Sequence, residues 1–113
     1  MNYQRWSDFE INQAVTCELF GCHQWQVNQF GSFYHCGPDG SGYYEVTIDD
    51  YCNNPSNAWS IIVSMISGGC VVQMIQAGVI VTLQGGGRIQ VMDKNTLRAA
   101  MIIFLMMREE QKS

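Results

Sequence analysis

The sequence of 113 residues is hydrophobic at 47% of its positions and charged at only 14%, against about 25% charged residues in typical globular domains. This length has room for one core of ordinary size, and the apolar content is too high for intrinsic disorder. We therefore expect a single domain over residues 1–113. Six Lys and Arg against ten Asp and Glu give a formal net charge of −4. Because the chain lacks the basic stripe that holds phosphate backbones, we expect no direct binding to nucleic acid.

The apolar segments are too short or too interrupted for export or for a membrane span. Residues 1–20 contain four charged side chains where a secretory signal needs an unbroken apolar region. The longest uninterrupted apolar run, residues 99–107, is about half the length of a transmembrane helix. We expect a cytoplasmic protein without a membrane association. Its five cysteines, an odd number, are then expected to be free thiols.

The first half of the chain predicts one helix and two strands. Residues 7–10 (Ser-Asp-Phe-Glu) fit a capping box, and apolar residues then recur at helical spacing, so a helix is expected over about residues 8–20, ending at Gly21. From Gln24, alternation of apolar and polar residues predicts a half-buried strand that extends to Tyr34. Turn residues fill positions 36–42. A second strand is expected over residues 43–48, with its even-numbered side chains facing the core.

The second half begins with the clearest helix signal in the chain. Asn54 can cap a helix, and Pro55 at the first helical position loses no hydrogen bond, so a helix is expected over about residues 55–66. Its core-facing stripe includes Trp59. Short apolar or alternating segments follow, separated by glycine-containing turns and expected to form a meander, at residues 70–75, 79–83 and 88–92.

A last helix, expected over about residues 96–110, is apolar on every side between residues 99 and 107. Such a helix needs burial on more than one face, and a single sheet would cover only one. The other face would then meet a second copy of the chain, which predicts a homo-oligomer, most simply a two-fold dimer. The order of elements predicts an α+β fold, with three helices layered on a mainly antiparallel sheet of about four to five short strands.

Cysteine and histidine are the residues most suggestive of chemistry. Cys22-His23 and His35-Cys36 contain the residue types of a zinc site, but neighbours in an extended segment point to opposite faces. A nucleophile system built on Cys36 and His35 has no geometry that the sequence fixes. We therefore expect no metal, no cofactor and no catalytic residue. Two alternatives stay open, a zinc-stabilised structural module and a small enzyme that uses these Cys and His residues.

Three segments of the chain together resemble one family. They are residues 7–12 (Ser-Asp-Phe-Glu-Ile-Asn), residues 52–62, which contain Cys-Asn-Asn-Pro and Ala-Trp, and residues 95–102 (Asn-Thr-Leu-Arg-Ala-Ala-Met-Ile). In this order they are similar to the NinX-like family of small accessory proteins of lambdoid phages and prophages. The resemblance implies an accessory phage protein of the host cell cytoplasm, in a family without an established catalytic activity.

Such a protein is expected to act by binding, in counter-defence or host takeover. It would either block a host defence protein or sequester a small nucleotide immune signal. An anionic nucleotide needs aromatic and donor groups in a pocket, for which a boundary between subunits is the candidate place. The candidate ligand-binding residues are Tyr43, Asn53, Arg88 and Arg98. A protein inhibitor needs only an exposed apolar or aromatic patch, and the composition does not distinguish the two. The small enzyme, acting on a nucleotide signal or a host protein, is the alternative of a different class.

Overall fold

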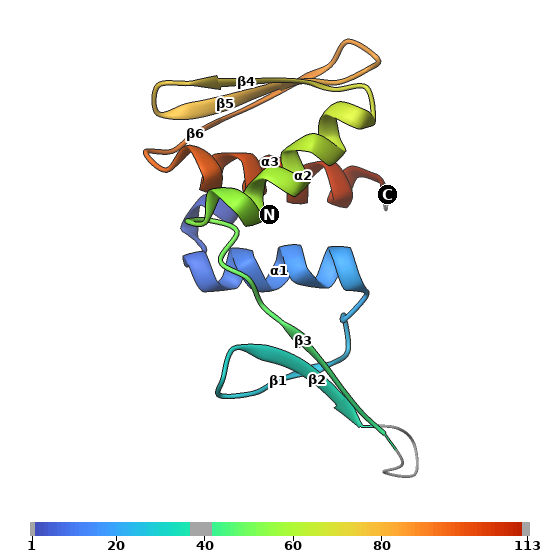
Figure 1. Cartoon of the computed structure of the whole chain (residues 1–113). Coiled ribbons are helices and arrows are strands. Elements are labelled where there is room, and N and C mark those ends of the chain that lie inside the picture. Colours follow the sequence, from blue (N-terminus) through green and yellow to red (C-terminus); the bar gives the residue numbers. More distant parts are fainter. Residues whose placement is uncertain (1, 37–41, 112–113) are drawn as a thin grey trace.

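The computed structural model describes residues 2–36 and 42–111. Its helices lie between two small antiparallel sheets, one at each end of the molecule (Figure 1). The helical elements are a 3-10 turn at Tyr3–Arg5 and the helices α1 (Asp8–Phe20), α2 (Pro55–Ser67) and α3 (Thr96–Gln111). The first sheet contains β1 (Gln26–Val27), β2 (Ser32–Cys36) and β3 (Tyr43–Thr47), and the second contains β4 (Val71–Ile75), β5 (Gly78–Thr82) and β6 (Arg88–Met92). The predicted α+β class with three helices is confirmed, and the strands divide into two sheets.

The predicted helix ends are confirmed. They could be predicted because they depend on side chains within a few positions of each end. The Ser7 hydroxyl accepts from the Glu10 amide at 3.1 Å, and the Glu10 carboxylate accepts from the Ser7 amide at 2.9 Å. Gly21 leaves α1 with a positive φ of 69°, which glycine adopts at little cost. The Asn54 side chain accepts from the Ser56 amide at 2.9 Å at the start of α2.

Helix α3 forms the centre of the molecule. Seven consecutive residues, from Ala99 to Leu105, are buried. In Figure 1, α1 lies on one side of α3 and the β4–β6 sheet on the other, and α2 packs along it. The expectation that only one face of this helix is covered within the subunit is therefore wrong, because α1 covers the side opposite the second sheet. The predicted dimer stays a prediction, but it no longer follows from α3.

The segment expected to be one strand from Gln24 to Tyr34 folds back on itself. The Asn28 side chain accepts from the amides of Phe30 and Ser32, both at 3.0 Å, and Gly31 takes a positive φ of 80°. This is the turn chemistry of an Asn side chain that bonds the backbone two residues on. The chain therefore reverses between β1 and β2, which pair antiparallel.

Two aromatic residues expected in the core are exposed. Tyr44 lies on β3, in a sheet that contributes no residue to the main core. Trp59 lies on the outer side of α2, whose buried side chains are Ala58, Ile61, Ile62 and Met65. Both corrections have one cause. Hydrophobic spacing locates the apolar side of a helix or strand, but the packing of other elements decides which residues on that side are covered. Of the turn expected at residues 36–42, residues 37–41 lie outside the described part of the chain.

The meander predicted from residues 70–92 is confirmed, with strands in the order β4-β5-β6. Gly78 starts β5 opposite Met92 of β6. A Cβ atom at Gly78 would lie 2.7 Å from the Val91 carbonyl oxygen and 2.8 Å from the Met92 sulfur. Close approach of two strands therefore requires glycine here. Among the described helices, none is both long and apolar enough to cross a membrane.

Candidate functional site

Arg98, in the first turn of α3, holds three parts of the chain together. Its Nη1 lies 2.7 Å from the Asp8 carboxylate and its Nε lies 3.0 Å from the Asp93 carboxylate. Its Nη2 donates to three backbone carbonyls before α1, those of Tyr3, Gln4 and Trp6. Burial disfavours the charged guanidinium, but Asp8 and Asp93 outweigh it, and the pKa of Arg98 is raised above its usual value. The side chain is 11% exposed, and each of its nitrogens already donates a hydrogen bond.

Asparagine side chains extend this arrangement to the start of α2. Asn95 caps α3 by accepting from the amides of Leu97 and Arg98. Its side-chain amide donates to the Cys52 carbonyl at 2.6 Å and to the Asn53 side chain at 3.0 Å. Asn53 in turn donates to the carboxylates of Asp8 and Asp50, both at 3.1 Å.

Helix α1 contributes the last member, Asn12. Its side chain donates to the Asp50 carboxylate and accepts from the Cys52 amide, both at 3.0 Å. We call the whole set the Arg98 network, with the members Asp8, Asn12, Asp50, Asn53, Asp93, Asn95 and Arg98. It joins the starts of α1, α2 and α3, which are the three segments that carried the family resemblance. Its members hydrogen-bond to one another and to backbone groups of the chain, so the network connects the three helix starts and has the geometry of a structural element.

The four candidate ligand-binding residues do not form one site within a single chain. Asn53 and Arg98 meet through the Asp8 carboxylate, to which both donate. Tyr43 and Arg88 lie in the sheets at opposite ends of the molecule (Figure 1), which is 48 Å long. A site that combines all four would have to be shared between subunits, as the sequence interpretation proposed.

The sequence reasoning missed Asp8 and Asp93 as partners of Arg98, although one signal was present. A cation in the first turn of a helix is disfavoured by the helix dipole. Arg98 lies in this first turn, directly before an apolar segment. A cation in such a position needs nearby carboxylates to compensate its charge. The signal predicts acidic partners but does not say which ones, because Asp8 is 90 positions away.

The β1–β3 sheet, with the turn at residues 28–31, extends away from α1 (Figure 1), and we call it the aromatic arm. Phe30 is 81% exposed, and Tyr43 and Tyr44 are each 58% exposed. Rings stack on both faces of the arm. Trp25 stacks on His35 with ring centroids 5.4 Å apart, and Tyr34 stacks on Tyr43 at 6.1 Å.

The charge of the aromatic arm is neutral to acidic. Residues 22–47 contain no Lys or Arg. The Tyr43 hydroxyl donates to the Glu45 carboxylate at 3.0 Å, and this hydrogen bond raises the pKa of Tyr43. The Tyr34 hydroxyl donates to the Gln26 side chain. The arm therefore presents aromatic rings and their hydroxyl groups without a cation that would hold an anionic ligand.

The cysteines and histidines lie in different surroundings. His35 and Cys36 are neighbours in β2 and so point to opposite faces. Cys52 is buried, and this desolvation raises the pKa of its thiol to about 12, which makes it a poor nucleophile at neutral pH. Across residues 2–36 and 42–111, no three His, Cys, Asp or Glu side chains are grouped as a metal site requires.

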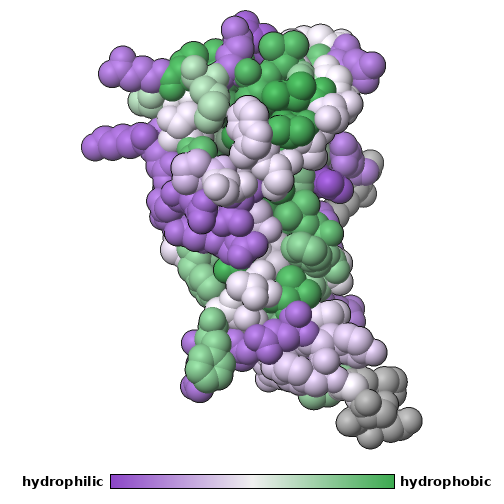
Figure 2. Space-filling view, in the orientation of Figure 1, coloured by the Kyte–Doolittle hydropathy of each residue, from purple (hydrophilic) through white to green (hydrophobic). Residues whose placement is uncertain are grey.

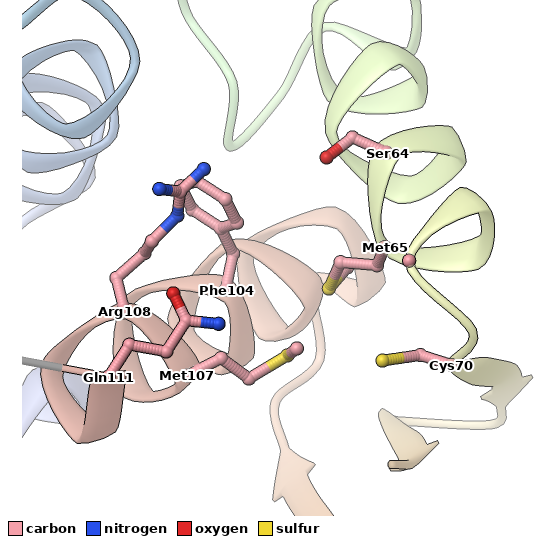
Figure 3. Close-up of a pocket in the computed structure, with 8 residues that line it drawn as sticks. Ser64, Met65, Cys70, Phe104, Met107, Arg108 and Gln111 are labelled. Atoms are coloured by element: carbon pink, nitrogen blue, oxygen red, sulfur yellow. The ribbon is translucent and has the colours of Figure 1, made fainter. Parts of the chain in front are cut away.

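Two cavities lined by described residues have volumes below or at the lower limit of those of small-molecule sites. The first, of about 250 Å³, lies between the C-terminal ends of α2 and α3, where the Arg108 guanidinium lies 5.0 Å from the Phe104 ring centre. Figure 3 shows the residues that line it. A second, of about 310 Å³, lies beside α1 and α3 and is lined in part by Tyr3, Glu18 and Glu109. Small-molecule sites occupy about 300–1,000 Å³. The first cavity is below this range, and the second, at its lower limit, carries two carboxylates that would repel an anionic nucleotide.

These observations define a class of protein, an α+β domain in which one polar network joins three helices between two small sheets. The chain belongs to the family described as "Bacteriophage P22, NinX", whose model matches residues 2–108. The match spans all three segments of the resemblance, which is thereby confirmed. No curated protein and no solved structure matches the chain.

Proposed function

We propose that this NinX-family protein is a non-enzymatic binding module that docks its aromatic arm on a host protein during phage infection, in counter-defence or host takeover. The observation that carries the proposal is the exposure of Phe30, Tyr43 and Tyr44 on one projecting sheet. Tyrosine and tryptophan are the residues that most often supply the binding energy at protein interfaces.

The exposure of these rings has no explanation in the stability of the domain. Of the residues that the structure describes between 22 and 47, none belongs to the main core. A sheet of short strands gains little from aromatic side chains that remain in water, because their burial is what stabilises a fold. Aromatic rings that remain in water are available for burial against a partner, and tyrosines are frequent at such contacts.

The chemistry of the arm favours a protein partner over a nucleotide. The arm lacks Lys and Arg, and the guanidinium of Arg98 is committed to Asp8, Asp93 and backbone carbonyls. The partner surface that fits is apolar and neutral or weakly basic, with hydrogen-bonding groups for the tyrosine hydroxyls. Sequestration of a nucleotide signal therefore ranks second.

The experiment is co-purification from an infected or prophage-bearing host, followed by affinity measurement with the purified partner. The double variant Tyr43→Ser, Tyr44→Ser is expected to weaken binding about 30-fold or more, as loss of a hot spot worth about 2 kcal/mol does. Trp59→Ser is the matched control, since Trp59 is also 58% exposed but lies on α2. It is expected to bind like the unmodified protein.

Two results would contradict the proposal. One is a partner whose affinity falls with Trp59→Ser but not with the arm variant. The other is a thermal-shift screen in which a cyclic nucleotide or an NAD-derived signal raises the melting temperature by several degrees while no host protein is retained. The second result would favour sequestration of a nucleotide.

A further inference from the structure

Strand β4 is an edge of the second sheet, and it carries none of the usual protections of an edge. Its sequence, Val-Val-Gln-Met-Ile, contains no charge and no proline. Val71, on one face of the strand, is 59% exposed, and Met74, on the other face, is 46% exposed. Figure 2 shows hydrophobic residues gathered at this end of the molecule. Exposed, uncharged and apolar edges are templates for pairing with another strand.

The opposite edge of the same sheet, β6, is protected. Its first residue is Arg88, and the Gln4 side-chain amide donates to the Met92 carbonyl at 2.9 Å. Both edge strands pack against a helix on one face, β6 against α3 and β4 against α2, so helix packing does not distinguish them. Within the described part of the chain, no side chain makes a comparable hydrogen bond to the backbone of β4, so the two edges differ in how they are covered.

We propose that β4 pairs antiparallel with β4 of a second copy of this chain, with the two-fold axis at Gln73, to form a continuous six-stranded sheet. In this register Val71 lies opposite the partner's Ile75, and Val72 lies opposite the partner's Met74. Each apolar residue of the strand meets an apolar residue on the same face, and Gln73 meets its own copy. Outward-pointing amides and carbonyls of each edge find partners.

The occupant that fits is a second copy because the strand is complementary to itself under a two-fold rotation. A two-fold interface requires the same patch to serve both subunits, and the sequence Val-Val-Gln-Met-Ile has an apolar pair on each side of one central polar residue. No charge has to be neutralised. A five-residue edge buries less than the roughly 1,200–2,000 Å² of a standard interface, so the dimer is expected to dissociate in the micromolar range.

The test measures the oligomeric state of the full chain by sedimentation from about 1 to 200 μM. Gln73→Lys places two like charges directly opposite each other at the axis, which disfavours strand pairing. It is expected to raise the dissociation constant at least about tenfold. Gln90→Lys on β6 is the matched control, because Gln73 and Gln90 flank the same residue, Ile80, from its two sides. It is expected to leave the dimer unchanged.

A mixture of Gln73→Lys and Gln73→Glu tests the register itself. Only a two-fold axis at residue 73 sets the two opposite charges face to face, so the mixture is expected to dimerise at least as well as the unmodified chain while each variant alone does not. A chain that stays monomeric up to 200 μM would overturn the proposal. So would equal weakening by Gln73→Lys and Gln90→Lys, or a mixture that fails to associate, with circular dichroism confirming that every variant is folded.

Discussion

Replacing Arg98 by Met is the sharpest test of how this domain is held together. The substitution removes hydrogen bonds to two carboxylates and to three backbone carbonyls. Removing one member of a buried ion pair costs about 3–5 kcal/mol. Asp8 is 45% exposed, so water recovers part of its loss and the lower end of that range applies. Loss of a cation from the helix N-terminus returns about 0.5 kcal/mol. We expect the free energy of unfolding to fall by about 2.5 kcal/mol.

The measurement is urea unfolding followed by circular dichroism, supported by thermal melting. At about 4 °C per kcal/mol for a domain of this size, the melting temperature of Arg98→Met should fall by about 10 °C. Arg98→Lys should recover less than half of the loss, because an ammonium group cannot span two carboxylates and a row of carbonyls as a guanidinium does.

Arg108→Met is the control on the same helix. Arg108 lies over Phe104 in the last turn of α3, where its contact with the ring is worth about 0.5–1 kcal/mol. The reasoning about the Arg98 network is refuted if Arg98→Met lowers the free energy of unfolding no more than Arg108→Met does.

Three further predictions concern the strand contact, a buried tyrosine and the thiols. Gly78→Ala should cost about 2–3 kcal/mol in thermal melting, because its Cβ would meet the Val91 carbonyl, whereas Gly85→Ala, with open space around it, should cost less than 1 kcal/mol. Burial and the hydrogen bond to Glu109 raise the pKa of Tyr3 to about 12. The folded state thus holds this proton more tightly than the unfolded state does, so the stability that the proton contributes is present below about pH 10 and is lost between about pH 10 and 12. In pH-dependent unfolding, Tyr3→Phe should flatten this fall in stability. An unchanged slope would contradict the assignment. In a thiol-reagent assay Cys36, which is exposed, should react before Cys52, which is buried, and a faster reaction at Cys52 would refute this.

The sequence predicted those parts of the fold that depend on neighbouring residues. The caps at Ser7 and Asn54, the exit at Gly21 and the meander of β4–β6 all follow from chemistry within a few positions. The turn at Asn28, which divides the predicted strand into β1 and β2, was missed because the phenylalanines beyond it continue the apolar pattern.

What the sequence did not predict depends on contacts between distant segments. Periodicity placed Trp59 in a core-facing stripe, but its exposure is decided by which side of α2 meets α3. In the same way, Arg98 and Asn53 were recognised as candidate residues, but nothing local indicates that Asp8 ties them together. The two sheets also lie on opposite sides of the helices, an arrangement that element order alone does not distinguish from one larger sheet.

The separation of the aromatic arm from the main core has a consequence for how this protein changes over time. The main core lies in the helices and the second sheet, and none of the described residues between 22 and 47 belongs to it. Substitutions on the arm surface are therefore nearly free of a folding penalty. If the arm binds a host protein as proposed, a lineage could exchange the partner it binds while the scaffold that carries the arm stays the same.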